Sequence, residues 1–276
     1  MTGPVITGRT GIVFILGDPV AQIIGSAEMN RSFVGWGMDI AVSPLHVRAE
    51  DLEACVSLLR KVPNVVGFGL TIPHKISIVQ LVDHLTDAAR QVGAVNFVRR
   101  NSDGSLTGTN MDGAGFIQGL KDRKVTLTGR SVLLIGAGGA ARAIGFALAE
   151  AGVGKITLVN RTHLRATALA RDIQTAARGC QIDADTYPLC LRNFDLLVNT
   201  TSVGMGENSG SPIDLAGLTK ATVVADVIMK PSVTVLLADA AARGCVTIGG
   251  KAMLRPQAEL VAKFLNLEAA SPLQDE

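Results

Sequence analysis

The sequence has little cysteine and few metal-ligating residues in any regular spacing. The four cysteines form no C-x-x-C pair, and the four histidines are as widely scattered. The cysteines are Cys55, Cys180, Cys190 and Cys245. Such spacing argues against both a zinc site and a disulfide framework. We therefore interpret the cysteines as reduced thiols and expect no bound metal.

An excess of charge of one sign is also lacking. The chain has 26 Lys and Arg against 24 Asp and Glu, a net charge of +2. So small a charge gives no strong field for nucleic acid or for an anionic membrane. We expect a small-molecule partner. The content of 47% hydrophobic and 18% charged residues excludes intrinsic disorder.

Long hydrophobic runs are absent. The longest, Val132–Ala141, is rich in glycine and alanine and ends at Arg142, far below the roughly 20 residues of a membrane-spanning helix. Near the N-terminus, the apolar run Ile12–Leu16 is brief and Asp18 follows it, which does not fit a secretory signal. We expect a cytoplasmic protein without a transmembrane segment.

Instead, short apolar runs alternate with helix-patterned runs, which predicts an α/β protein with mainly parallel strands. A length of 276 residues favours two domains, because a single core stops growing at roughly 250–300 residues. In the first part the alternating runs are 11–16, 27–35, 40–42, 50–61 and 65–72. Segments 93–100 and 105–109 flank the turn sequence Asn101–Gly104, which predicts a hairpin. We place the domain boundary near residue 112.

The second part predicts a six-stranded doubly wound sheet of the Rossmann type. The strands that we identify are 131–135, 155–159, 195–199, 221–227 and 244–248, with helices after the first two and at 233–243. A final helix at about 252–267 follows, and its pattern allows packing on either domain.

A glycine-rich turn joins the strand 131–135 to a helix. The fingerprint residues are Gly136, Gly138, Gly139, Ala140 and Ala141. The first glycine permits a tight turn, the second permits close approach of a pyrophosphate, and Ala141 permits helix–strand packing. The alternative is a turn that only packs a helix on a sheet. The strand before and the helix after it favour a dinucleotide site.

The residues at the end of the next strand indicate which dinucleotide the protein binds. An NAD enzyme places an acid there for the ribose hydroxyls, but no acid occurs between Glu150 and Asp172. Asn160, Arg161, Thr162 and Arg165 stand there instead. A guanidinium and a hydroxyl suit a 2′-phosphate, so we predict NADP. The alternative is a pair of solvated arginines at a helix start.

A reactive group is suggested by Leu70-Thr71-Ile-Pro73-His74-Lys75. Pro73 suits a helix start, so we expect Lys75 on the first turn of a helix, at a strand end where ligands bind in α/β proteins. Taken alone, Lys75 is predicted to be a solvent-facing residue, and His74 a surface or capping residue.

Together with Gly93-Ala-Val-Asn96 and Asn110-Met-Asp112-Gly113, this segment resembles the shikimate dehydrogenase family. The resemblance continues nearly to the end of the chain, through 136–142, 160–162, 199–205, 226–237 and 250–257. It implies a substrate domain of residues 1–112 and 250–276, and an NADP-binding Rossmann domain of residues 113–249.

The resemblance also implies roles for single residues. Lys75 and Asp112 would flank the carbinol carbon of a cyclic hydroxy acid, with Thr71, Asn96 and Gln257 on its hydroxyls. Thr200, Met205 and Gly250 would join the cofactor site. A lysine that reaches the reacting oxygen accepts or stabilises charge there, and either Lys75 or Asp112 could be the base.

The sequence departs from the family at the loop that holds the substrate carboxylate. Ile23 and Gly25 replace the two serines of the family's S-K-S-P motif. Ser26 replaces one hydroxyl or serves as a helix N-cap. This chain has Gly69 where the family typically has an asparagine. It has Met229-Lys230 where the family has a tyrosine and an asparagine. Each lost polar partner costs roughly 1–3 kcal/mol.

The sequence thus predicts an NADP-dependent oxidoreductase that interconverts shikimate, quinate or a related alicyclic hydroxy acid and its 3-dehydro form. A paralogue with another ring substrate and a catalytically silent NADP-binding regulator are the alternatives. We expect a monomer or a homodimer.

Overall fold

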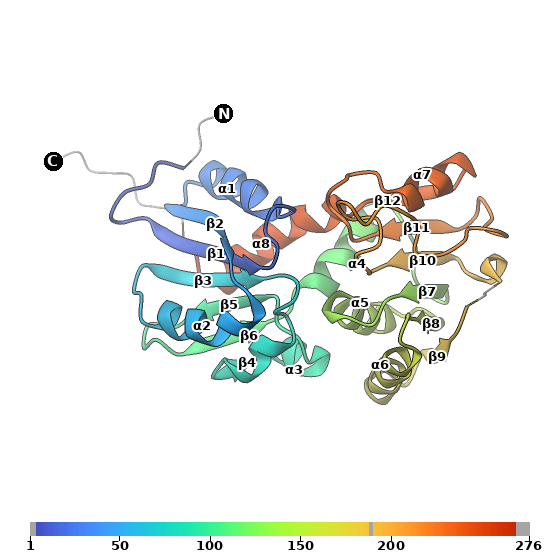
Figure 1. The fold of residues 1–276 in the computed structure, drawn as a ribbon, viewed down its shortest axis with the longest axis horizontal. Coiled ribbons are helices and arrows are strands. Elements are labelled where there is room, and N and C mark those ends of the chain that lie inside the picture. Colours follow the sequence, from blue (N-terminus) through green and yellow to red (C-terminus); the bar gives the residue numbers. More distant parts are fainter. Residues whose placement is uncertain (1–3, 188–189, 269–276) are drawn as a thin grey trace. The chain divides into compact units, whose positions relative to one another are not determined.

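The computed structural model describes residues 4–187 and 190–268 (Figure 1). The chain divides into two compact units, residues 1–111 with 255–276 and residues 112–254. No helix within the described ranges is both long enough and apolar enough to cross a bilayer.

The first unit contains a mixed sheet of six strands in the order β2-β1-β3-β5-β6-β4. The strands are β1 (Gly11–Gly17), β2 (Ile40–His46), β3 (Val65–Leu70), β4 (His84–Leu85), β5 (Phe97–Arg100) and β6 (Leu106–Thr109). β1 is parallel to both β2 and β3, whereas β5 is antiparallel to β3 and β6. The β5–β6 pair is the predicted hairpin, and Gly104 takes a positive φ of 85° in its turn.

Helices cover both faces of this sheet because β1 is apolar on both sides. Leu16 packs in one core cluster with Val56 of α2, and Val13 packs in the other with Phe33 of α1 and Val261 of α8 (Figure 1). The helices are α1 (Gly25–Gly35), α2 (Leu52–Arg60), α3 (Asp87–Val92) and α8 (Leu254–Phe264), with 3₁₀ turns η1 (Ala49–Asp51) and η2 (Ser77–Gln80). The last helix therefore completes the core of the first unit.

The second unit is a doubly wound sheet of six parallel strands, in the order β12-β11-β10-β7-β8-β9. Its strands are β7 (Ser131–Ile135), β8 (Lys155–Val159), β9 (Gln181–Asp185), β10 (Leu196–Asn199), β11 (Val223–Asp226) and β12 (Val246–Ile248). Its helices are α4 (Asp112–Asp122), α5 (Gly139–Glu150), α6 (His163–Ala176) and α7 (Val235–Ala242), with 3₁₀ turns η3 (Leu191–Asn193) and η4 (Gly250–Met253). The strand order reverses between β7 and β10, which is the topological switch point where such sheets bind ligands.

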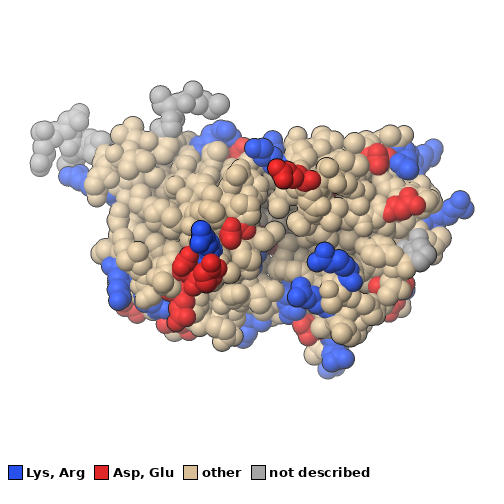
Figure 2. Space-filling model, viewed as in Figure 1, with Lys and Arg blue, Asp and Glu red and all other residues tan. Residues whose placement is uncertain are grey.

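The face of the molecule drawn in Figure 2 carries no large region of one charge among the described residues. Figure 2 shows basic and acidic side chains singly or in small groups among uncharged residues on the face in view. This distribution agrees with the net charge of +2.

Candidate active site

Three strands of the first unit meet at one edge of its sheet. The parallel strands β1 and β3 end there, and the antiparallel strand β5 begins there. Backbone hydrogen bonds join the segments, from the Thr71 amide to the Leu16 carbonyl (2.9 Å) and from the Leu70 amide to the Asn96 carbonyl (2.8 Å). The topology thus brings Thr71 and Asn96 to the same edge, although 25 positions separate them in the sequence.

The buried Asn96 side chain connects two chain segments at this edge. Its side-chain oxygen accepts a hydrogen bond from the Met111 amide at 2.9 Å. The neighbouring Val95 amide donates to the Lys75 carbonyl at 2.7 Å. Lys75 and the chain that leads into Asp112 are therefore each held to the segment around Asn96.

The structure corrects the expectation for Lys75 and His74. Residues 72–76 form turns, and the first helical residue is Ser77 of η2, so Lys75 does not lie on a helix. The His74 amide closes a turn onto the Thr71 carbonyl at 2.9 Å. The His74 ring is only 1% exposed, and its Nε2 lies 2.8 Å from the Val47 carbonyl oxygen. His74 is thus neither a surface nor a capping residue; it fixes the turn that carries Lys75.

The loop between β1 and α1 carries a second correction. α1 begins at Gly25 with Ile24 at the N-cap position, so Ser26 lies inside the first turn and is not the N-cap. The reason is that the preceding loop is already helical in its backbone at Ile24, with φ −108° and ψ −13°. Ser26 is 8% exposed, and within the described ranges its hydroxyl has no hydrogen-bond partner in the protein.

The remaining two predicted residues lie on helices. Gln257 lies on α8 and is buried in the first unit. Asp112 is the first residue of α4, is buried, and belongs to the second unit. It directly follows Met111, the residue whose amide binds Asn96.

In the second unit the glycine turn has the predicted order of strand, turn and helix. Gly136 follows β7 with a φ of +116°, and its amide donates to the Val159 carbonyl at 2.8 Å. Gly138 is the N-cap of α5, and a Cβ there would meet no atom within 4 Å. Gly139 and Ala140 form the first turn, and Ala141 is fully buried. An open helix N-terminus of this kind fits a pyrophosphate.

The end of β8 carries the predicted cations. Asn160 follows the strand, and its side-chain amide donates to the Thr162 carbonyl at 2.9 Å, where α6 begins. Arg161 and Arg165 are exposed, and neither forms an ion pair with any residue that the structure describes. Their guanidinium groups are free for a phosphate.

A buried polar network at the ends of β10 and β11 was not predicted. The Asn199 amide and the Thr234 hydroxyl both donate to the Asp226 carboxyl, at 3.1 and 2.7 Å. The Asn199 oxygen in turn accepts from the Thr201 amide at 3.0 Å. Burial raises the pKa of Asp226, while its hydrogen bonds act in the opposite direction. The network holds the loop that follows β10. The sequence could have indicated it, because polar residues at the ends of parallel strands often mark a binding site.

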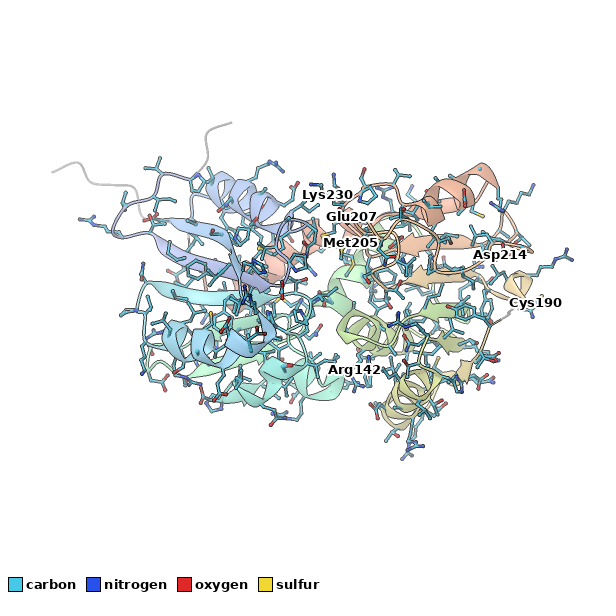
Figure 3. The ribbon with its side chains drawn as sticks, viewed as in Figure 1. Arg142, Cys190, Met205, Glu207, Asp214 and Lys230 are labelled. Atoms are coloured by element: carbon cyan, nitrogen blue, oxygen red, sulfur yellow. The ribbon has the colours of Figure 1, made fainter. Side chains whose placement is uncertain are left out.

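Three other predicted cofactor residues lie around that loop. The Thr200 hydroxyl donates to the Ile135 carbonyl at 2.6 Å and so joins the loop to β7. Figure 3 places Met205 and Lys230 at the end of the sheet where β10 and β11 finish, away from Cys190 and Asp214. The Gly250 amide donates to the Ile228 carbonyl at 3.3 Å at the start of η4.

The two units together define a dinucleotide-dependent dehydrogenase with a separate substrate domain. Family models match both units: the shikimate dehydrogenase substrate binding domain at residues 15–98, and shikimate / quinate 5-dehydrogenase at residues 119–205. The chain belongs to the shikimate dehydrogenase family.

Similar proteins agree with this assignment. The shikimate dehydrogenase (NADP(+)) of Geobacter metallireducens is 41% identical over 92% of this chain and 90% of its own length. A crystal structure of a shikimate dehydrogenase in complex with NADP⁺ has a TM-score of 0.89 at 30% identity, covering 97% of this chain and 94% of the other. A 5-ketofructose reductase from a Gluconobacter strain has a TM-score of 0.83 at 34% identity, covering 95% and 96%.

Proposed function

We propose that this chain is an NADP-dependent dehydrogenase that interconverts shikimate, quinate or a related alicyclic hydroxy acid with its 3-dehydro form. The observation that carries the proposal is the first unit's sheet edge, where Thr71, Lys75 and Asn96 are held together by backbone hydrogen bonds. The family match of both units supports the same activity.

NADP fits the residues that the second unit presents. The open N-terminus of α5 at Gly138–Ala140 suits the pyrophosphate, and the unpaired Arg161 and Arg165 with Thr162 suit a 2′-phosphate. Thr200, Met205 and Gly250 would complete the site. When bound, NADP supplies the hydride acceptor for oxidation and, reduced, the hydride donor for reduction.

The first unit's residues would bind and orient the ring. Thr71, Asn96, Ser26 and Gln257 offer hydroxyl and amide groups that both donate and accept hydrogen bonds, as ring hydroxyls require. Such fixed positioning lowers the entropic part of the barrier.

Lys75 and Asp112 would handle the proton. As the carbinol carbon loses its hydride, the hydroxyl loses its proton to one of these two groups, acting as general base. Asp112 would also orient the Lys75 ammonium. In the reverse direction the same pair returns the proton to the carbonyl oxygen.

An assay of NADPH formation with shikimate and quinate, and of NADPH consumption with 5-ketofructose, tests this function. We expect NADP-dependent turnover of shikimate or quinate. Retention of both Lys75 and Asp112 argues against a silent regulator, and absence of turnover with all substrates would refute the proposal. A monomer or a homodimer in the cytoplasm, acting on a small molecule and not on nucleic acid, is the proposed state of the enzyme.

A further inference from the structure

The loop from Asp18 to Gly25 borders the proposed substrate site. The Asp18 amide donates to the Ile72 carbonyl at 2.9 Å, and a Cβ on Gly17 would overlap the Thr71 side chain. The loop therefore lies against the segment that carries Thr71 and Lys75, and its side chains decide what the neighbouring end of the substrate meets.

The charge of this loop is unfavourable for an anion. From Asp18 to Asn30 the only charged residues are Asp18 and Glu28, both acidic. The first cation that follows is Arg31, and its guanidinium is paired with Glu28 at 2.5 Å. Asp18 lies 2.7 Å from the His46 ring, and Glu28 pairs with Arg31, so residues 18–30 offer a carboxylate no unpaired cation. Like charges disfavour an ionised group, and burying an unpaired charge is costly.

The polar groups of the loop are mostly occupied or missing. The Gln22 side-chain amide donates to the Pro19 carbonyl at 2.5 Å. The Ile23 side chain packs against the core cluster that contains Val13 and Phe33. Gly25 is buried and has no side chain to offer. At the sheet edge nearby, the Phe97 ring fills the space beside Gly69, because a Cβ on Gly69 would approach that ring to 3.0 Å.

One hydroxyl is left, that of Ser26. It is the only hydroxyl between residues 19 and 26. The residue is 8% exposed, and its hydroxyl is not a fully buried atom, so the hydroxyl is accessible to a ligand. A serine hydroxyl both donates and accepts, which matches the hydrogen-bonding capacity of another hydroxyl, whereas a carboxylate requires donors alone and usually several of them.

We propose that this end of the site binds an uncharged hydroxyl or hydroxymethyl group, so that the enzyme acts on uncharged polyhydroxylated ring alcohols and their ketones at least as well as on ring carboxylates. This inference rests on the proposed dehydrogenase function. The reaction is balanced as before: the ring alcohol gives a hydride from its C–H bond to NADP⁺ and a proton from its O–H bond, and yields the ketone, NADPH and H⁺.

A matched pair of substrates tests the inference: shikimate and its alcohol, in which a hydroxymethyl group replaces the carboxylate. We expect kcat/KM for the alcohol to equal or exceed that for the acid. The double variant Ile23→Ser with Gly25→Ser should raise kcat/KM for the acid relative to the alcohol by about tenfold, if each new hydrogen bond contributes on the order of 1 kcal/mol.

The double variant Ile23→Ala with Gly25→Ala is the control, because it loses the same packing without adding a hydroxyl. It should not improve turnover of the acid. A parent enzyme that prefers the acid by about tenfold or more, or a serine variant that gains no more than the alanine variant, would overturn the inference, since Ser26 and the α1 amides would then suffice for a carboxylate. Absence of turnover with both compounds would overturn the inference, and the dehydrogenase function would fall as well only if quinate and 5-ketofructose were also not turned over.

Discussion

The hydroxyl oxygen of Thr200 lies so close to Gly136 that a Cβ on Gly136 would overlap it. Gly136 also has a φ of +116°, which side-chain-bearing residues rarely adopt. By contrast, Gly138 has a φ of −90°, and a Cβ there would meet nothing within 4 Å. The two glycines of one turn therefore serve different purposes, the first for the fold and the second for the ligand.

We predict that Gly136→Ala lowers the free energy of unfolding by about 1–3 kcal/mol, the usual cost of such backbone strain. Gly138→Ala should unfold at nearly the parent temperature but bind NADP more weakly, because its methyl group would stand where the pyrophosphate approaches. Thermal unfolding and NADP titration separate the two effects. Equal loss of stability in both variants would contradict this division.

Lys75 and Asp112 are the candidates for proton transfer. We expect Lys75→Ala to lower kcat by roughly 10²–10⁴-fold, the usual contribution of a positioned acid or base, and Asp112→Asn to lower it as well. NADP affinity should be unchanged for Lys75→Ala, because Lys75 lies in the first unit. Steady-state kinetics and NADP titration check both points. Activity within about threefold of the parent for Lys75→Ala would exclude it from general acid–base catalysis.

Arg161 should determine the choice of cofactor. Because a charge-assisted hydrogen bond is worth about 1.5–3 kcal/mol, we expect Arg161→Ala to lower kcat/KM for NADP by about tenfold or more while NAD is little affected. Arg171→Ala is a matched control, since Arg171 is exposed on the same helix, α6, but farther from the end of β8. The claim fails if the parent uses both cofactors equally, or if the two variants behave alike.

Asp195 gives the stability a predictable dependence on pH. The Ser131 amide donates to its carboxylate at 2.8 Å and, with the Arg130 guanidinium at 2.9 Å, lowers its pKa. A carboxyl whose pKa is lower in the folded state stabilises the fold above the unfolded value of about 3.9, and this contribution is lost as the pH falls through the folded value.

We therefore expect Asp195→Asn to be less stable than the parent at pH 7, by at most about 1 kcal/mol because the pair is largely exposed. The difference should shrink as the pH is lowered below the unfolded pKa. Chemical denaturation of both proteins across this range measures it. A difference that grows on acidification would reverse the assigned sign.

The strands that the sequence predicts best are those whose apolar runs are continuous. The predicted bounds of β7 and β8 are confirmed, because both strands are buried on two sides of a parallel sheet. β9 was missed, since its sequence Gln-Ile-Asp-Ala-Asp is mostly polar. It lies at the edge of the sheet, where one neighbour is enough and burial is incomplete.

Local pattern was less informative about the turn that carries Lys75. Pro73 is typical of a helix start, yet residues 71–76 do not form a helix. A contact that is distant in sequence, between the buried His74 ring and the Val47 carbonyl, helps to hold this turn. The hydrogen-bond network of Asn199, Asp226 and Thr234 could not be predicted from the sequence either, because its members come together only when β10 and β11 pair. The residue roles in the candidate site stay predictions.

The helix α8 has a consequence for how the chain is made. Val261 and its neighbours on α8 fill the same core cluster as Val13 and Phe33, yet the whole second unit is encoded between them. During synthesis from the N-terminus, the parallel sheet of the second unit leaves the ribosome before α8 does. The second unit is therefore free to fold while one face of the first is still uncovered, and the first unit becomes complete only after the whole second unit has been translated.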